Sequence, residues 1–184
     1  MIAQAEAPIP MEQDFAAIYQ EQHGRIFRLC RYLLNSADAA EDAAHEVFLR
    51  AQKRESTYDP SLPISSWLSG IATNHCIDLL RRRGTERRVF HLDSAEMAEP
   101  PSRGPSPLTE MLVSERGNGV RGALSRLAEK YRVPLVLVYY NEMTYDEIAS
   151  ALGLNRNLVA TLIFRAKQQL RLMLQKEKHR GMSH

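Results

Sequence analysis

The chain has few cysteines, few aromatic residues and no long apolar run. Its 184 residues include two cysteines, one tryptophan and 7% aromatic residues. Cys30 and Cys76 have no C-x-x-C partner, so we expect packing residues in a reduced compartment, with a regulatory thiol as the minor alternative. No apolar run approaches the ~20 residues of a membrane span, and no basic region at the N-terminus precedes a hydrophobic stretch. We expect a cytoplasmic protein without membrane insertion.

Motifs of catalysis and metal binding are missing as well. The sequence contains no Gly-rich phosphate loop, nucleophile elbow or zinc-protease signature, so we expect no enzymatic activity and no cofactor. Asp42, His45 and Glu46 stand close together, but without a second His or Cys set at ligand spacing they predict no metal site. His75 falls on an apolar helical face and is predicted to be a core histidine.

The charge is distributed in blocks. Residues 1–60 hold ten acids against six bases, whereas residues 81–91 hold five arginines against one acid. Residues 116–184 hold twelve bases against five acids, a net charge of +7. Alternating blocks are typical of several contact surfaces, and the positive C-terminal part can attract nucleic-acid phosphates.

A proline-rich acidic stretch divides the chain. Four prolines stand between His91 and Glu110, and such a segment cannot bury enough surface to fold alone. We therefore predict an all-α fold of two small helical domains joined by a flexible linker, the second domain containing a helix-turn-helix. The predicted parts are a flexible N-terminus (1–11), a first domain (12–90), the linker (91–107), a second domain (108–175) and a tail (176–184).

Apolar residues at helical spacing predict three helices in the first domain. The first helix ends near Asn35, the second covers 38–53, and the third begins at Pro63 and ends at Gly84. The expected core face of the first helix is Phe15, Ile18, Tyr19, Ile26, Leu29, Cys30 and Leu33. That of the second is Ala40, Ala43, Ala44, Val47, Phe48 and Ala51. That of the third is Ile64, Trp67, Leu68, Ile71, Ala72, His75 and Leu79.

Helices at about 108–127, 129–141, 144–152 and 155–175 are predicted for the second domain. The run "VPLVLVYY" is read as a buried helix with Pro134 in its first turn, in preference to a strand. Thr144 and Glu147 form a capping box, and Gly153 stands where a left-handed C-cap is expected. A second helix follows after a short turn, as in a helix-turn-helix. Its expected core face is Val159, Ile163, Ala166 and Leu170.

Stretches on both sides of the linker resemble bacterial sigma factors of the extracytoplasmic-function group, within the sigma-70 family. "DAAEDAAHEVFLRAQK" followed by "SSWLSGIATNHCIDLLRRR" is similar to their promoter-melting domain, and "LSRLAEKYRVPLVLVYYNEMTYDEIASALGLNRNLVATLIFRAKQQLRLML" is similar to their second domain. The resemblance implies a protein that binds core RNA polymerase and directs it to promoter DNA without catalysing a reaction. It also implies control by an anti-sigma factor.

The resemblance assigns three contact surfaces. Helix 38–53 would bind the clamp helices of the largest polymerase subunit through Asp38, Glu41, Asp42, His45, Glu46, Leu49 and Arg50. The −10 element would be opened and read by Tyr58, Asn74, Asp78, Arg81, Arg82, Arg83, Arg87 and Arg88. The −35 duplex would be read by Arg156, Asn157, Thr161, Phe164, Arg165, Lys167, Gln168 and Arg171.

The residue types fit these assignments. A charged rim around exposed Leu49 suits a partner helix better than nucleic acid, the alternative being an ordinary solvated face. Asp78 is placed to pair with Arg82, which leaves other arginines for phosphates. Tyr58 suits the wall of a pocket for an unpaired base, whereas Trp67 is expected in the core.

The chain departs from the family pattern at several positions. His45 stands where glutamine is usual, and Ala160 and Leu162 stand where basic residues often contact DNA. Leu158, Leu162 and Phe164 are therefore expected either to contact thymine methyl groups or to form an apolar patch that an anti-sigma factor covers. Two other functions stay open at this point: a stand-alone helix-turn-helix regulator that never engages polymerase, and a helical interaction module with no DNA role.

Overall fold

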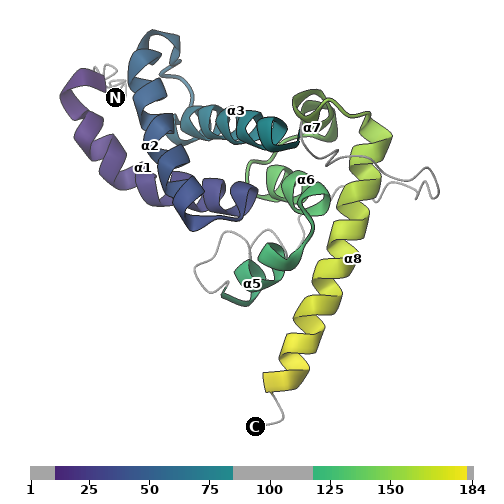
Figure 1. Cartoon of the computed structure of the whole chain (residues 1–184). Helices are drawn as coiled ribbons and strands as arrows, with labels where there is room; N and C mark the ends of the chain where they lie inside the picture. Colours follow the sequence, from purple (N-terminus) through teal and green to yellow (C-terminus); the bar gives the residue numbers. More distant parts are fainter. Residues whose placement is uncertain (1–10, 85–117, 182–184) are drawn as a thin grey trace, which may run out of the picture.

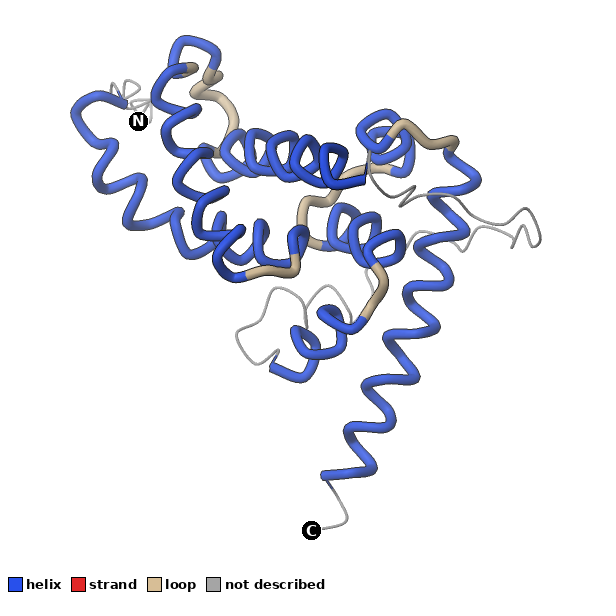
Figure 2. The backbone as a smooth tube through the Cα atoms, viewed as in Figure 1, coloured by secondary structure: helices blue, strands red, loops and turns tan. Residues whose placement is uncertain are grey.

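The fold is entirely helical in the part of the chain that the structure describes. The computed structural model describes residues 11–84 and 118–181 (Figure 1). These residues form seven α-helices and one short 3-10 turn, with no strand among them (Figure 2). The all-α prediction is confirmed for this part. The predicted linker 91–107 and the first part of the predicted helix 108–127 lie outside the described residues.

Three helices form the N-terminal half: α1 (Met11–Leu34), α2 (Ala37–Lys53) and α3 (Ile64–Gly84). Asn35 ends α1 in a left-handed conformation (φ 54°), which asparagine tolerates better than most residues. Ser36 then caps α2, its hydroxyl accepting a hydrogen bond from the Ala39 amide at 3.3 Å. A 3-10 turn (Glu55–Thr57) and a loop lead to α3. The predicted break between the first two helices is confirmed.

The predicted core faces of these helices are confirmed. All six apolar positions named for α2 are buried, and four of them are alanines, which lets neighbouring helices approach closely. Ile26, Leu29 and Leu33 of α1 and Leu68 of α3 are fully buried. The remaining residues of the α1 and α3 stripes are buried or partly buried against this core.

Cys30 and Cys76 face each other inside this core. Both residues are buried. A hydrogen bond from the Cys76 thiol to Cys30, together with burial, raises the pKa of Cys76 above its ordinary value. The thiol form is therefore stable, which agrees with the predicted packing role.

The C-terminal half contains α5 (Asn118–Arg126), α6 (Glu129–Tyr139), α7 (Tyr145–Leu152) and α8 (Arg156–Gly181). The run "VPLVLVYY" lies in α6 except for Tyr140, which follows the helix as its C-cap, and it is mostly buried, so the helix prediction is confirmed. Because α6 already begins at Glu129, Pro134 lies in its second turn and not, as expected, in its first. Helix α8 continues to Gly181, beyond the predicted end at 175, and extends away from the other helices (Figure 1).

The helix-turn-helix between α7 and α8 is confirmed in its local detail. Thr144 and Glu147 form the capping box, and hydrogen bonds from Thr144 lower the pKa of Glu147. Gly153 adopts the left-handed conformation at φ 68°, where any side chain would be strained. The Asn155 carboxamide oxygen then accepts a hydrogen bond from the Leu158 amide at 2.8 Å, which caps α8.

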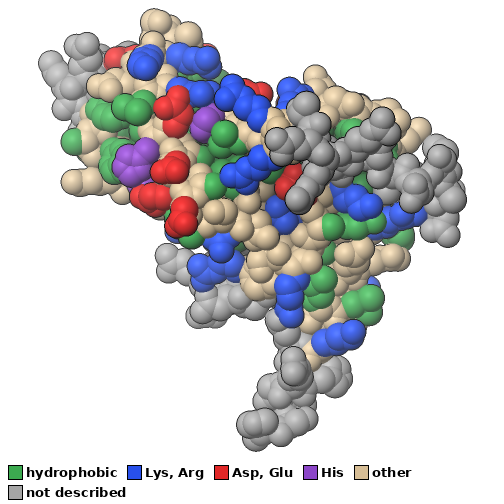
Figure 3. Space-filling view, viewed as in Figure 1, with side chains coloured by type: hydrophobic (Ala, Val, Ile, Leu, Met, Phe, Trp, Pro, Cys, Tyr) green, Lys and Arg blue, Asp and Glu red, His purple; other side chains and the backbone are tan. Residues whose placement is uncertain are grey.

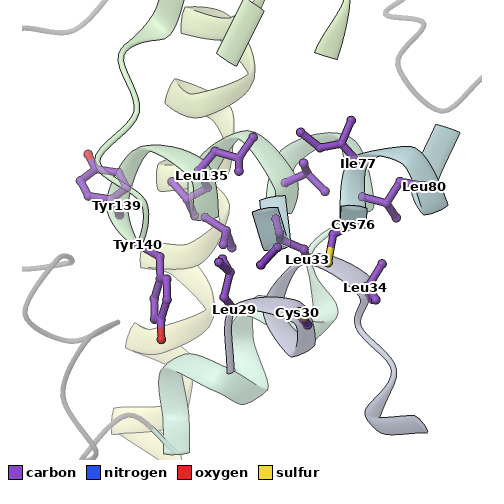
Figure 4. Packing of buried hydrophobic residues seen from close by; sticks show 14 of the residues in the cluster. Leu29, Cys30, Leu33, Leu34, Cys76, Ile77, Leu80, Leu135, Tyr139 and Tyr140 are labelled. Atoms are coloured by element: carbon purple, nitrogen blue, oxygen red, sulfur yellow. The ribbon is translucent and has the colours of Figure 1, made fainter. Parts of the chain in front are cut away.

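The two halves pack against each other, which the sequence did not predict. Helix α1 contacts α6 and α5, and α3 contacts α7. Figure 4 shows side chains of α1 and α3, among them Leu33 and Cys76, in the same group as Leu135 of α6 and Tyr140, the residue after α6, and all belong to one hydrophobic cluster. The Tyr140 hydroxyl donates to the Arg25 carbonyl at 3.1 Å, and the Asn35 amide group donates to the Ser125 carbonyl at 2.9 Å.

Arg132 is a charged residue buried in this interface, with 4% of its surface exposed. Its guanidinium group donates to the carbonyls of Tyr32 (3.0 Å), Leu33 (3.4 Å) and Leu127 (2.9 Å). Tyr32 and Leu33 belong to the last turn of α1, whose carbonyls have no partner within the helix. Arg132 thus caps α1 from the other half of the chain, at the negative end of the helix dipole.

Candidate functional site

The first candidate surface, which we call the α2 face, is the outer side of α2. It comprises the seven residues predicted to bind polymerase: Asp38, Glu41, Asp42, His45, Glu46, Leu49 and Arg50. All seven are exposed or partly exposed, because the opposite side of α2 carries the buried alanines, Val47 and Phe48. In Figure 3, acidic side chains and histidines gather over α1 and α2. The structure therefore brings this predicted set together on one helix face.

Leu49 lies exposed within this charged face. Its exposed fraction is 52%, which makes it one of three large apolar side chains that are exposed among the described residues. Next to it, Glu46 accepts a hydrogen bond from Arg50 Nε at 2.7 Å, and this bond lowers the pKa of Glu46. Glu46 is therefore ionised and held in one orientation, so that the face presents an apolar side chain beside a fixed ion pair.

The second candidate surface, the α3 end, is the C-terminal part of α3. Asn74, Asp78, Arg81, Arg82 and Arg83 are all exposed there. Asp78 lies 4.0 Å from Arg81, so the expected partner Arg82 was the wrong one. Arg81 also donates to the carbonyl of Ala151 in α7. The arginines collect where the helix dipole is negative, which favours them before any DNA is bound.

The remaining residues predicted to read the −10 element do not all join the α3 end. Tyr58 packs near the start of α3, with its ring 5.2 Å from Trp67 and its hydroxyl donating to the Leu62 carbonyl at 2.8 Å. Trp67 is only partly buried, so it closes the edge of the core and is not enclosed by it. His75 is buried as predicted, and burial lowers its pKa. Arg87 and Arg88 lie outside the described residues.

The third candidate surface, the α8 face, is the outer side of α8. The predicted core residues Val159, Ile163, Ala166 and Leu170 are buried, as expected. Among the predicted DNA-binding residues, Asn157, Gln168 and Arg171 are exposed and Phe164, Arg165 and Lys167 are partly exposed. Arg156 is exposed too, but it already pairs with Asp146 at 3.3 Å and lies over the Tyr145 ring.

Three residues of α8 are placed differently from the expectation. Thr161 is only 5% exposed, and its hydroxyl donates to the Asn157 carbonyl at 3.0 Å. Ala160 and Leu162, which replace often basic positions, are also buried. Helix α8 is thus buried all round between Val159 and Ile163. Thr161 does not face outward, and Leu162 belongs to no exposed apolar patch; both expectations are wrong for this structure.

The interface between the halves places the α3 end next to the helix-turn-helix. Besides the bond from Arg81 to Ala151, Asn141 donates to the hydroxyl of Thr73. These contacts join α3 to α7 and to the loop before it. The α3 end therefore lies beside α7, the first helix of the helix-turn-helix, in this arrangement.

One histidine near the α2 face was missed by sequence reasoning. His23 of α1 lies 3.7 Å from Glu41 of α2, and His45 lies equally close to the same carboxylate oxygen. The signal was in the sequence, because Tyr19 and His23 are one turn apart on the α1 face that was predicted to pack. The sequence alone does not show that this turn of α1 packs against Glu41 and His45 of α2.

Two family models match the chain. The model described as "Sigma-70 region 2" matches residues 18–86, and the model described as "Sigma-70, region 4" matches residues 118–170. These ranges contain the α2 face, the α3 end and, except for Arg171, the α8 face. Among the described residues, no helix combines the length and the apolar character needed to cross a bilayer.

Two curated relatives and one solved structure are similar over most of the chain. An extracytoplasmic-function sigma factor of Bacillus subtilis, SigW, is 32% identical over 173 residues, covering 89% of this chain and 90% of the relative. SigM of the same organism is 26% identical, with 85% and 92% covered. The sigma factor RpoE of Bartonella quintana, solved in complex with the anti-sigma factor NepR, shares the fold at a TM-score of 0.55 and 19% identity, covering 89% of this chain and 98% of RpoE.

Proposed function

The chain belongs to the extracytoplasmic-function group of sigma-70 RNA polymerase sigma factors, and from this we propose which of its surfaces performs each step of promoter-specific initiation. A sigma factor binds core polymerase and directs it to promoters, and it acts by binding. The α2 face contacts core polymerase, the α3 end and Tyr58 engage the −10 element, and the α8 face engages the −35 duplex. The observation that carries the proposal is that family matches and predicted surfaces coincide in both halves.

The α2 face suits a protein partner. Protein interfaces combine an apolar centre with a polar rim, and exposed Leu49 beside the Glu46–Arg50 pair has this composition. The acidic residues of the rim would steer association with a basic partner surface. The proposed partner surface is the pair of clamp helices on the largest polymerase subunit.

The α3 end and the α8 face suit nucleic acid for different reasons. Exposed Arg82 and Arg83 at the α3 end can contact the phosphates of a melted strand, and the Tyr58 ring offers a surface on which a base can stack. On α8, Asn157 and Gln168 can hydrogen-bond base edges in the major groove, whereas Arg165 and Arg171 can contact phosphates. With Thr161 buried, the −35 contact rests on fewer side chains than the sequence suggested.

Control by an anti-sigma factor is part of the proposal. RpoE of Bartonella quintana was solved with the anti-sigma factor NepR, and it shares the fold of this chain. An anti-sigma factor that binds the α2 face or the α8 face would block contacts needed for initiation.

In vitro run-off transcription tests the proposed function. Core RNA polymerase, the purified chain and a genomic fragment library are incubated together, with core polymerase alone as the control. We expect new discrete start sites whose alignment reveals a −10 and a −35 element. If the chain bound specific duplex DNA but neither bound core polymerase nor produced transcripts, it would be a stand-alone regulator and the proposal would fail.

Replacing Arg165 with alanine is expected to weaken promoter binding by roughly three- to tenfold. Loss of one phosphate contact should also reduce the slope of log affinity against log salt by about one. The measurement is fluorescence anisotropy of a promoter duplex with reconstituted holoenzyme at several salt concentrations. Lys176→Ala, which removes an exposed charge beyond the proposed α8 face, should change neither quantity; an Arg165→Ala variant that behaves in the same way would contradict the assignment.

Replacing Glu46 with lysine is expected to lower the affinity for core polymerase by about tenfold, because the acidic rim loses a fixed charge and Arg50 loses its partner. The pair is partly exposed, so the fold should be unaffected. Affinity is measured by titrating labelled chain with core polymerase. Glu21→Lys makes the same charge change at an exposed site on α1 and should bind core polymerase with normal affinity. If the two variants had equal affinity, Glu46 would not be part of the interface.

A further inference from the structure

A cluster of His23, Glu41 and His45 joins α1 to α2. One possible ligand atom from each residue lies within 4.8 Å of the other two. His23 Nε2 and His45 Nδ1 are both 3.7 Å from the same Glu41 oxygen. In a tetrahedral zinc site with bonds of about 2.1 Å, neighbouring ligand atoms are about 3.4 Å apart. Small side-chain rotations would therefore suffice to bring the three atoms around one ion.

One ring nitrogen of His23 faces this cluster and is unsatisfied. His23 Nε2 is buried and makes no hydrogen bond to any described residue. Buried polar atoms are almost always satisfied, so an orphan nitrogen beside a carboxylate calls for an explanation. A metal ion would accept the lone pair of His23 Nε2 and so give this buried nitrogen a partner.

Aromatic packing holds the two imidazoles in place. The Tyr19 ring lies 4.9 Å from the His23 ring and 4.7 Å from Phe48, and Phe27 stacks on His23 at 6.3 Å. The Tyr19 hydroxyl is 3.4 Å from His45 Nε2. His45 Nδ1 lies 3.2 Å from the Glu41 carbonyl and would give up this contact on binding an ion. In that tautomer Nε2 carries the proton and donates to the Tyr19 hydroxyl, and the lone pair of Nδ1 faces the ion. Such an outer partner typically fixes the tautomer of a metal-binding histidine.

We propose that His23, Glu41 and His45 form a binding site for a divalent transition-metal ion of the zinc class. Two imidazoles and one carboxylate favour Zn²⁺, Ni²⁺ or Cu²⁺ over Mg²⁺ or Ca²⁺, which prefer oxygen ligands. Three protein ligands leave one position for water or for a group from a partner. The site depends on a departure from the family pattern, because His45 stands where glutamine is usual. The expectation of no metal site, which depended on the absence of a second histidine, would then be wrong.

Isothermal titration calorimetry of the full chain with ZnCl₂ tests the site on the free protein, so the result does not depend on polymerase binding. We expect one ion per chain at this site, and visible ligand-field bands when Co²⁺ replaces Zn²⁺. His23→Gln and His45→Gln should each weaken binding by about 100-fold or more, since even loss of outer partners costs 10- to 100-fold. Circular dichroism checks that both variants keep their helices.

Matched variants separate this site from adventitious binding. Asp42→Asn removes an exposed acid next to Glu41 without touching the cluster and should leave zinc affinity unchanged, whereas Glu41→Gln should weaken it. A variant without His179 and His184 should also bind normally. The proposal is overturned if the wild-type chain binds no zinc. It is equally overturned if His23→Gln and His45→Gln bind as tightly as the wild type, or if binding depends on His179 and His184.

Discussion

An Arg132→Met variant is expected to lose about 3 kcal/mol of unfolding free energy, which is the largest effect that we predict for a single substitution. The guanidinium is buried and is the donor to three carbonyls, two of them in the last turn of α1. Methionine fills similar volume but donates nothing, so buried carbonyls lose a charge-assisted partner. The measurement is urea denaturation of the full chain, followed by circular dichroism at the helical band.

Two further substitutions show whether the geometry of Arg132 matters. Arg126→Met removes an exposed arginine whose Nε donates to the Gly122 carbonyl of its own helix, and its cost should stay below about 0.5 kcal/mol. Arg132→Lys keeps the charge but cannot reach three carbonyls from one planar group, so an intermediate loss is expected. If Arg132→Met were no more costly than Arg126→Met, Arg132 would not stabilise the packing of the two halves.

A Leu49→Asp variant is expected to bind core polymerase roughly 30-fold more weakly, a loss of about 2 kcal/mol. Leu49 is half exposed near the C-terminal end of the α2 face, beside the Glu46–Arg50 pair, where an apolar side chain would be enclosed by the partner. Aspartate would place a charge in the dry centre of the interface and add to the acidic rim. Titration of labelled chain with core polymerase measures the loss.

The chain offers a close control for this substitution. Leu172 on α8 is exposed to a similar extent, 58% against 52% for Leu49. Leu172→Asp makes the same chemical change on another surface and should leave the affinity for core polymerase unaltered. Both variants should unfold at the wild-type temperature, because neither leucine is buried. Equal binding by the two variants would place the polymerase contact elsewhere.

Features that depend on neighbours in the sequence could be predicted. Thr144 and Glu147 of the capping box are three positions apart, and the left-handed Gly153 ends the same helix. The buried side of α2 also follows from its own periodicity, since residues three or four positions apart, on successive turns, lie on one face of a helix. Both the helix-turn-helix and the α2 face could therefore be found without a structure.

Features that depend on distant residues could not be predicted. Arg132 reads as an ordinary charged position, yet it binds carbonyls 99 and 100 residues earlier in the chain. His23 and His45 are on separate helices and meet only through the packing of α1 on α2. In α8, periodicity accounts for Val159 and Ile163 but not for buried Thr161, because a helical pattern reveals one packing face and not a second.

The bond from Arg81 to Ala151 has a consequence for the order of events at a promoter. It holds the α3 end against α7, one turn before α8 begins, whereas the −10 and −35 elements that we propose the α3 end and the α8 face contact are about 25 base pairs apart, or ~85 Å along the duplex. A chain in this arrangement can occupy one element but not both. The halves must part first, so each kcal/mol that holds them together lowers the apparent promoter affinity about fivefold. If these surfaces contact the promoter as proposed, the interface sets a free-energy threshold that polymerase must overcome before the promoter is bound.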